Sequence, residues 1–297
     1  MLKSFRVYRV HSDWPASETD LAQALEKAAF KPCNAFSEQS YGFEPPVETE
    51  QRSLARRLSG ADLVQLRHQT RVLPAAVVKE VLAERITEFT RRTSREPSRK
   101  EKRDLKEETY GELLPKALLR SDWIRGFYLR DEKVLVLATP TAKIAEEFLN
   151  TLREALGSLQ VTPLAFKQPT KSLLHDIFLG KSESSRFNLG RECRMKDPSE
   201  KGSNVSWLDM DLADSSVRKH VSDGLVLDRV GVQFDGIARL VLDEENVVRK
   251  LRFLGLEALD ELDDEDPLMR HDAEFTIEVG FAIKFLQALK ESLGGYA

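Results

Sequence analysis

The sequence predicts an α+β fold in which antiparallel sheets are covered by packed helices and a basic helical hairpin projects from the body. Strand patterns follow one another directly: residues 124–139 are typical of a hairpin, and residues 225–254 of a β-meander. Helical patterns stand apart from them, with apolar residues near a 3.6-residue period from 75 to 92 and a capping signal at Ser98. Strands that are grouped, rather than alternating with helices, indicate the α+β class.

The first seventy residues predict strands around one helix. Residues 4–10 alternate apolar and polar side chains, as strands do. Ser17, with Asp20 three residues later, resembles a capping box in which aspartate replaces the preferred glutamate, so a helix is expected to begin there. The glycine and prolines of 41–48 predict a loop, and residues 63–67 predict a short strand.

Two helices separated by Pro97 are predicted next. Six apolar residues near the helical period mark the first of them: Val77, Val78, Val81, Leu82, Ile86 and Phe89. Pro97 should stop or sharply kink this helix. Ser98 and Glu101 form a capping box for a second helix, whose later turns Gly111 and Pro115 should make irregular.

The remaining elements follow the same reasoning. Residues 142–156 are expected to form a helix and residues 159–166 a further strand. Residues 181–206 are rich in serine, lysine and glutamate without a clear period, which indicates a linker. Residues 216–224 predict a short helix, and residues 273–295 predict a strand running into a helix that ends on a glycine.

The chain of 297 residues exceeds the usual size of a single core, so two or three subdomains are expected. We expect a central α+β region built from 1–73 and 119–180, and a basic helical arm, or tip, at 74–118. A mobile linker or finger segment at 181–224 and a C-terminal meander with its helix at 225–297 complete the division.

Composition predicts a soluble cytoplasmic protein. Cys33 and Cys193 lie far apart and outside any paired motif, which is typical of a reducing compartment without a disulfide framework. The first residues lack the apolar core of a signal peptide, and no window approaches the roughly 20 apolar residues that span a bilayer.

Charge is segregated along the chain, although the formal net charge is only −4. Residues 51–106 carry fifteen Lys and Arg against seven Asp and Glu, whereas residues 241–275 carry four against twelve. The peak is 91–103, RRTSREPSRKEKR, with seven basic side chains in thirteen. Segregation of this kind indicates a surface that faces a polyanion.

The basic arm has a simpler alternative explanation, since most charge runs are merely solvated. Three arginines assigned to the last turn of the first helix favour its dipole and need no function: Arg91, Arg92 and Arg95. Four cations in the first turns of the second helix oppose its dipole: Arg99, Lys100, Lys102 and Arg103. With Lys106, Arg99 and Arg103 share one helical face, so an external polyanion is the simplest compensation.

Duplex DNA, contacted through its phosphates, is the polyanion that the arm fits best. Residues 91–106 contain no aromatic side chain for base stacking, and no Asn or Gln for reading base edges. Contacts to phosphate are largely independent of sequence. The sequence therefore predicts a nonspecific double-stranded DNA-binding surface on this arm.

No catalytic constellation is expected, and neither a metal nor a cofactor. The GKS at 180–182 lacks the earlier glycine of a phosphate-binding loop, because His175 occupies that position. The five histidines show no metal-binding spacing. Seven acids between 257 and 266 leave open one alternative, a metal-dependent nuclease, although a solvated loop explains them as well.

The whole chain resembles the bacterial recombination-associated RdgC family. The resemblance rests on short segments in a specific order and spacing: AFKPC (29–33), GFEPP (42–46), RVLPAAVVK (71–79), ELLPKAL (112–118), REALGSLQVTPL (153–164), VRKLRF (248–253), HDAEFTI (271–277) and ESLGG (291–295). It implies a horseshoe-shaped protomer that forms a ring-shaped homodimer, encloses duplex DNA and has no enzymatic activity. It also implies antagonism of RecA-promoted strand exchange and a place in the nucleoid.

Some positions of this chain match the residues expected from the family, and others depart from them. Seven basic residues stand where the family has basic residues: Arg71, Lys79, Arg95, Arg99, Lys102, Lys106 and Lys116. Leu118 stands where a family aromatic takes part in subunit contact, although a buried core leucine is an equal alternative. Family members can carry lysines where this chain has Asp209 and Met210, so a basic gate at 206–212 is in doubt.

Overall fold

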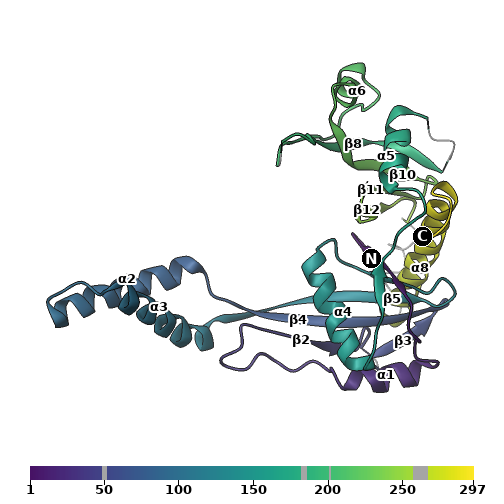
Figure 1. Cartoon of the computed structure of the whole chain (residues 1–297). Coiled ribbons are helices and arrows are strands. Elements are labelled where there is room, and N and C mark those ends of the chain that lie inside the picture. The colour runs from purple at the N-terminus through teal and green to yellow at the C-terminus, as the bar shows by residue number, and fades with distance from the viewer. Residues whose placement is uncertain (49–51, 182–185, 201, 257–266) are drawn as a thin grey trace.

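The computed structural model describes residues 1–48, 52–181, 186–200, 202–256 and 267–297. The fold is α+β, with two antiparallel sheets and a long two-helix hairpin that extends away from them (Figure 1). This confirms the predicted class and the predicted projecting hairpin. Within the described residues, none of the helices combines the length and the hydrophobicity that crossing a bilayer requires.

The first sheet has seven strands in the order β2-β4-β5-β6-β1-β7, with β3 paired to β4. Their bounds are β1 Arg6–Val10, β2 Gln39–Glu44, β3 Ala55–Leu58, β4 Ala61–Val72, β5 Leu118–Leu129, β6 Val134–Leu137 and β7 Val161–Pro163. The pair β4 and β5 stays in register over twelve positions, from Ala61 opposite Leu129 to Val72 opposite Leu118. Its outer half continues beyond the body and carries the hairpin (Figure 1).

Helices α1 (Glu18–Glu26) and α4 (Ala142–Leu156) cover one face of this sheet. The expected capping box begins α1, since the Ser17 hydroxyl accepts from the Asp20 backbone and the Asp20 carboxylate accepts from the Ser17 backbone. The core beneath them contains Phe43, Leu66 and Phe148. Alternation along β4 and β5 sends every second side chain into this core, and that buried face fixes the register.

The second sheet has five strands in the order β12-β11-β10-β8-β9. Their bounds are β8 Phe187–Lys196, β9 Asn204–Trp207, β10 Val226–Phe234, β11 Ala238–Asp243 and β12 Val248–Phe253. Helices α5 (Thr170–Leu179), α6 (Ser215–Ser222) and α8 (Pro267–Ser292) contribute to its core.

Helix α8 joins the two sheets into one body. Phe275 packs edge-on to Phe127 of the first sheet, and Phe285 packs edge-on to Phe234 of the second. The buried Glu278 carboxylate accepts from Arg125 of β5 at 2.8 Å, which pairs a charge that would otherwise be costly to bury. The two cores therefore lie on opposite faces of β5, which belongs to the body and also extends to the hairpin.

The hairpin consists of α2 (Ala75–Thr93), α3 (Arg99–Leu113) and the short 3-10 helix η1 (Leu114–Lys116). The predicted boundaries agree closely, and η1 confirms the irregular end expected from Pro115. The apolar stripe of α2 is mostly half-buried, and Val78 is its one buried residue. A two-helix hairpin offers each helix a single partner, so it cannot bury a full apolar stripe.

Several expectations were wrong. The segment at 41–48, expected to be a loop, contains most of β2, and the strand expected at 63–67 extends over all twelve residues of β4. The segment expected to be a linker holds β8 and β9, and α5 was missed altogether. The strand expected after 273 is instead part of α8. The proposed division into domains stays a prediction.

Candidate nucleic-acid interface

The root of the arm is tied to the body by one arginine. The Arg71 guanidinium donates to the carbonyl oxygens of Leu114, Pro115 and Ala117 at 3.2–3.3 Å, and to that of Asn34 at 3.0 Å. The carbonyls of Leu114, Pro115 and Ala117 lie in and just after η1, where a helix end leaves some acceptors without intrahelical donors, and Asn34 belongs to the body. Arg71 therefore has a clear structural role, and its role in DNA binding stays a prediction.

The connection between α2 and α3 differs from the prediction. Helix α2 ends at Thr93, and Ser94 adopts a left-handed conformation with φ of 54°, so Arg95 lies beyond the last helical turn. Its guanidinium lies over the Phe89 ring, 5.3 Å from the centroid. The assignment of Arg95 to the helix end, where it would favour the dipole, is therefore wrong.

The second capping box forms as predicted, and Arg95 completes it. Glu101 accepts from the Ser98 backbone at 2.8 Å, while the Ser98 hydroxyl accepts from the Glu101 backbone at 3.4 Å. Arg95 donates to both carboxylate oxygens of Glu101, at 2.9 and 2.6 Å. This guanidinium, together with the Ser98 backbone, holds the pKa of Glu101 well below its usual range.

Two further cations of α3 have carboxylate partners on the arm. Lys102 lies 3.4 Å from Glu96. Arg103 lies 3.7 Å from Glu107, one turn further along the helix, and 3.8 Å from Asp104. An external polyanion was expected as the simplest compensation, but for these two cations acidic neighbours on the arm supply part of it. Exposed pairs of this kind stabilise by only about 0–1 kcal/mol and are easily exchanged.

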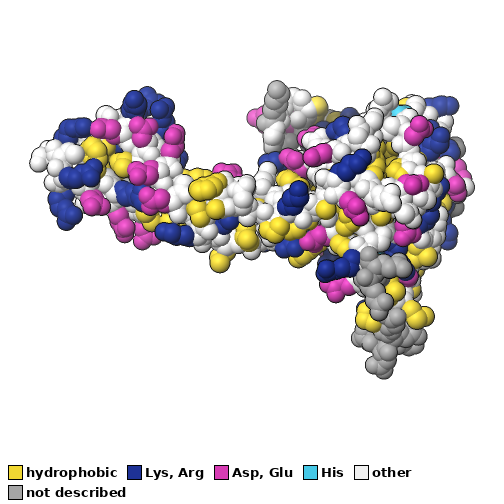
Figure 2. Space-filling view, turned by 90° about the horizontal axis from the view of Figure 1, so that it is seen from below, with side chains coloured by type: hydrophobic (Ala, Val, Ile, Leu, Met, Phe, Trp, Pro, Cys, Tyr) yellow, Lys and Arg dark blue, Asp and Glu magenta, His cyan; other side chains and the backbone are white. Residues whose placement is uncertain are grey.

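The other basic residues of the arm tip are exposed and make no ion pair within the part of the chain that the structure describes: Arg91, Arg92, Arg99, Lys100 and Lys106. Lys79 and Lys116, nearer the body, are exposed as well. Figure 2 shows dark-blue side chains gathered over the far end of the arm, interspersed with magenta ones. The structure thus separates the predicted DNA-binding cations into a paired set and an unpaired set.

Apolar side chains lie on the strands between arm and body, where yellow atoms show in Figure 2. Leu118 is 79% exposed, opposite the exposed Val72 in register. The alternative that Leu118 is a core residue is therefore wrong, whereas its place in a subunit contact stays a prediction. Leu119 and Trp123, which are also exposed, were missed, although apolar residues beside the polar 120–122 were a usable signal.

The segment with the doubtful gate carries an acidic residue held by an arginine. Asp209 adopts a left-handed conformation, and its carboxylate accepts from Arg191 at 2.7 Å. The same guanidinium donates to the Asp209 carbonyl oxygen at 3.1 Å. Met210 beside it is exposed. A basic gate built on lysines is therefore absent from 206–212, and the nearby positive charge belongs to β8.

No catalytic centre emerges from the described residues. They contain no group of three or more His, Cys, Asp or Glu side chains that could hold a metal ion. Burial raises the pKa of Cys193 to about 12, which suits a core thiol and not a nucleophile. The acidic cluster at 257–266, on which the nuclease alternative depends, lies outside the described residues.

Comparison with known proteins gives a match along the whole chain. A family model described as "Putative exonuclease, RdgC" matches residues 1–296. The chain is 30% identical over 295 residues to the recombination-associated protein RdgC of Shewanella loihica, covering 99% of this chain and 97% of that protein. The proteins of the same name from Shewanella oneidensis and Shewanella sediminis are 30% and 28% identical over the same share of each chain.

Proposed function

The chain belongs to the RdgC family of recombination-associated proteins, and on this premise we propose that it is a sequence-independent double-stranded DNA-binding protein without catalytic activity. It acts as a ring-shaped homodimer of horseshoe-shaped protomers that encloses the duplex, in the nucleoid of the cytoplasm. By occupying the duplex it antagonises RecA-promoted strand exchange.

The observation that carries the proposal is the unpaired set at the arm tip. Five exposed cations lie at the end of α2 and in the first half of α3, without a carboxylate partner among the described residues. Arg99 and Lys100 occupy the first turn of α3, where the helix dipole makes positive charge unfavourable by about 0.3–1 kcal/mol each. Phosphate groups of a duplex would neutralise all five.

The same surface supports binding without sequence preference. Arginine and lysine make most phosphate contacts, and these position a protein on DNA without reading its bases. No asparagine or glutamine lies between 91 and 106 to read a base edge in the major groove. Affinity should therefore be equal for unrelated duplexes of one length and fall steeply with salt.

Enclosure can be tested by topology. The full chain is bound at low salt to a closed circular duplex and to the same DNA after a single cut, and both are then challenged with high salt. A protein that encloses DNA slides off the cut form and stays on the circle. Equal loss from both would exclude enclosure, while leaving phosphate binding by the arm intact.

A nuclease remains the second candidate, because the family description names an exonuclease. The acids at 257–266 would have to hold the metal. Incubating end-labelled linear duplex with Mg²⁺ or Mn²⁺ distinguishes the two functions, since a non-catalytic binder leaves the label in full-length DNA. Release of labelled nucleotides that Asp263→Asn and Asp264→Asn together abolish would favour the nuclease.

A further inference from the structure

The outer face of the second sheet carries a small cationic pocket, away from the arm. On β11, Leu240 and Leu242 point into the core, so Val241 between them points to the opposite face. Around Val241 a pocket of about 120 Å³ is lined by Arg194, Arg229, Arg249 and Lys250, one or two from each of β8, β10 and β12. Nothing in the proposed function of the arm uses these residues.

Backbone irregularities bring these cations together. The register of β10 with β8 shifts twice, and the register of β11 with β12 shifts once. Beside the shift between β11 and β12, Lys250 has φ of 51°, a left-handed conformation that is uncommon for a residue other than glycine. Gly231 of β10 leaves room for Glu192, whose side chain and backbone would lie only 3.0 Å from a Cβ there. Irregularities of this kind re-aim side chains and cluster at functional places in sheets.

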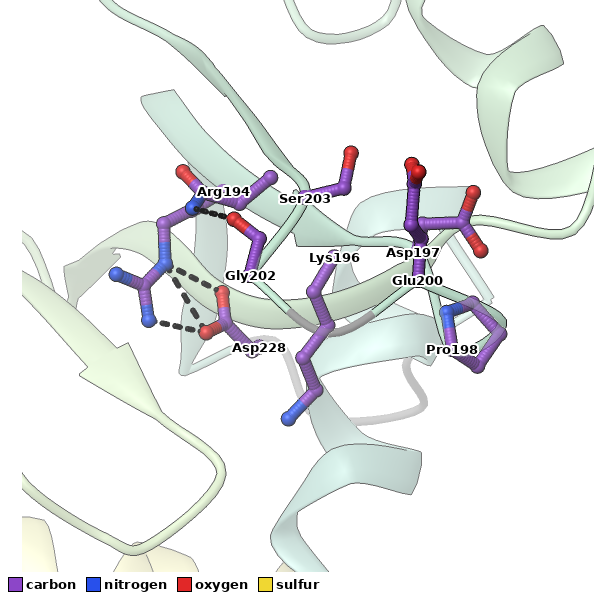
Figure 3. A pocket seen from close by; sticks show the side chains of 9 residues that line it. Arg194, Lys196, Asp197, Pro198, Glu200, Gly202, Ser203 and Asp228 are labelled. Atoms are coloured by element: carbon purple, nitrogen blue, oxygen red, sulfur yellow. Dashed lines mark hydrogen bonds and ion pairs between the residues drawn. The ribbon is translucent and has the colours of Figure 1, made fainter.

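Three of the four cations already have a carboxylate. Both carboxylate oxygens of Asp228 accept from the single Nε–H of Arg194, at 2.9 and 3.0 Å, and one of them also accepts from Arg194 Nη2. Figure 3 shows these contacts from the side of a neighbouring pocket. Arg249 lies 3.3 Å from Asp243, and Lys250 pairs with Glu192 across the sheet. These pairs hold the side chains in place around the pocket.

Arg229 is different, because no ion pair or hydrogen bond engages its guanidinium within the described residues. Its Nε atom is buried and has no hydrogen-bond partner. Burial lowers the pKa of Arg229, and the neighbouring Arg194 and Arg249 lower it further. A buried donor without an acceptor is costly, and a buried positive charge more so. The Arg229 side chain as a whole is half-buried, and Asp228 and Asp243 nearby raise its pKa only in part. Its guanidinium is therefore available, at a pocket also lined by Glu192, to an acceptor that carries negative charge.

We propose that this pocket binds a phosphate group, which Arg229 contacts directly while Arg194 and Arg249 flank it. The guanidinium of Arg229 can donate two parallel hydrogen bonds to an oxyanion. Arg194 and Arg249, which already hold Asp228 and Asp243, add positive charge beside it. The Ser206 hydroxyl, on the rim, adds a neutral donor. Two sources share this chemistry: free inorganic phosphate, and a phosphodiester of the DNA backbone. Only the second source rests on the proposed function.

The test compares Arg229→Gln with Arg239→Gln in the full chain. Arg239 is a matched control, because it lies on the same outer face, on β11, but is exposed and does not line the pocket. Thermal unfolding is followed in sodium phosphate and in sodium chloride of equal ionic strength. At about tenfold above Kd, phosphate should raise the Tm of the wild type and of the control by about 2–4 °C, and that of Arg229→Gln not at all.

The second arm of the test measures duplex affinity against salt for the same three proteins. If the natural ligand is a backbone phosphate, Arg229→Gln should reduce the log–log slope by about 0.9 relative to Arg239→Gln, even where free phosphate has no effect. Should Arg229→Gln fail to fold, Ser206→Glu replaces it, because this exposed position can place a carboxylate at the pocket without disturbing the core.

The two measurements test the phosphate pocket independently of DNA binding by the arm. A phosphate-dependent Tm shift lost in Arg229→Gln supports the pocket even if the arm proves not to bind DNA. A slope change without a Tm shift supports it as a DNA contact. If Arg229→Gln behaves like Arg239→Gln in both measurements, the pocket binds no phosphate and the inference is overturned.

Discussion

The division of the arm cations into paired and unpaired sets can be tested with two variants that remove the same number of positive charges. One variant removes three unpaired cations of α3, through Arg99→Ala, Lys100→Ala and Lys106→Ala. The matched variant removes three cations that already have carboxylate partners, through Arg95→Ala, Lys102→Ala and Arg103→Ala. Both lower the net charge of the arm by three within the same hairpin, so a long-range field effect would be equal.

The expected magnitude follows from counterion release. Each lost phosphate contact reduces the log–log salt slope by about 0.9, so loss of the unpaired set should reduce it by about 2.7 for each arm. When salt rises from 50 to 200 mM, the wild type should therefore lose roughly fortyfold more affinity than the variant without the unpaired set. Loss of the paired set should change the slope by less than about 1, because each of its cations must leave a carboxylate before it contacts a phosphate.

The assay is a fluorescence titration of labelled duplex at several salt concentrations, on two unrelated sequences. Thermal unfolding serves as the folding control. Removing Arg99 and Lys100 relieves an unfavourable interaction with the α3 dipole, so the Tm of that variant should not fall. Equal slope changes for the two variants would refute the idea that partner-free cations make the contacts. A larger change for the paired set would refute it more strongly.

Three further predictions concern stability and the root of the arm. Asp62 is fully buried and accepts from Arg57 Nε at 2.5 Å and from Trp14 at 2.8 Å, so Asp62→Ala should cost about 3–5 kcal/mol in urea unfolding; a loss below 1 kcal/mol would contradict this. Arg71→Leu should make amide hydrogen exchange in 112–118 roughly tenfold faster, through about 1–2 kcal/mol of lost hydrogen bonds; unchanged exchange would exclude the proposed clamp. Burial lowers the pKa of His68 in the folded protein below its ordinary 6.5. Between the two pKa values the unfolded chain binds a proton at His68 and the folded protein does not, so the free energy of unfolding should fall as the pH drops below about 6.5. His68→Gln should flatten that fall in a pH series of unfolding midpoints, and an unchanged slope would show that other groups cause it.

Local signals were sufficient where an element depends on its own neighbours in sequence. Both capping boxes formed as expected, at Ser17 and at Ser98, because a cap is satisfied by the backbone three residues away. Helix α4 and β6 also lie where the patterns put them, whereas β5 contains the predicted 124–129 but begins six residues earlier, at Leu118. The two caps are complete within four residues, and the hairpin of β5 and β6 within about a dozen, so local signals are enough to indicate them.

Tertiary contacts decided the elements that the sequence misassigned. Alternation at Phe275, Ile277 and Val279 is typical of a strand, yet α8 lies between two sheets and needs apolar residues around most of its circumference. The Gly42 segment is a strand because it pairs with β4. Glycine is required at 42 because the backbone of Phe30 lies so close that any Cβ would collide with it. Neither contact can be read from local spacing.

The arm shows the same division within a single site. The sequence alone determined that positive charge is concentrated between 91 and 106 and that two capped helices present it. The pair of Arg103 with Glu107 follows from helical spacing and could have been predicted. Only the tertiary structure decided the other pairs, because Ser94 turns Arg95 back onto Glu101 and the connection between the helices brings Glu96 to Lys102. Charge counts are additive along a chain, whereas ion pairing depends on distances of a few ångströms that the fold sets.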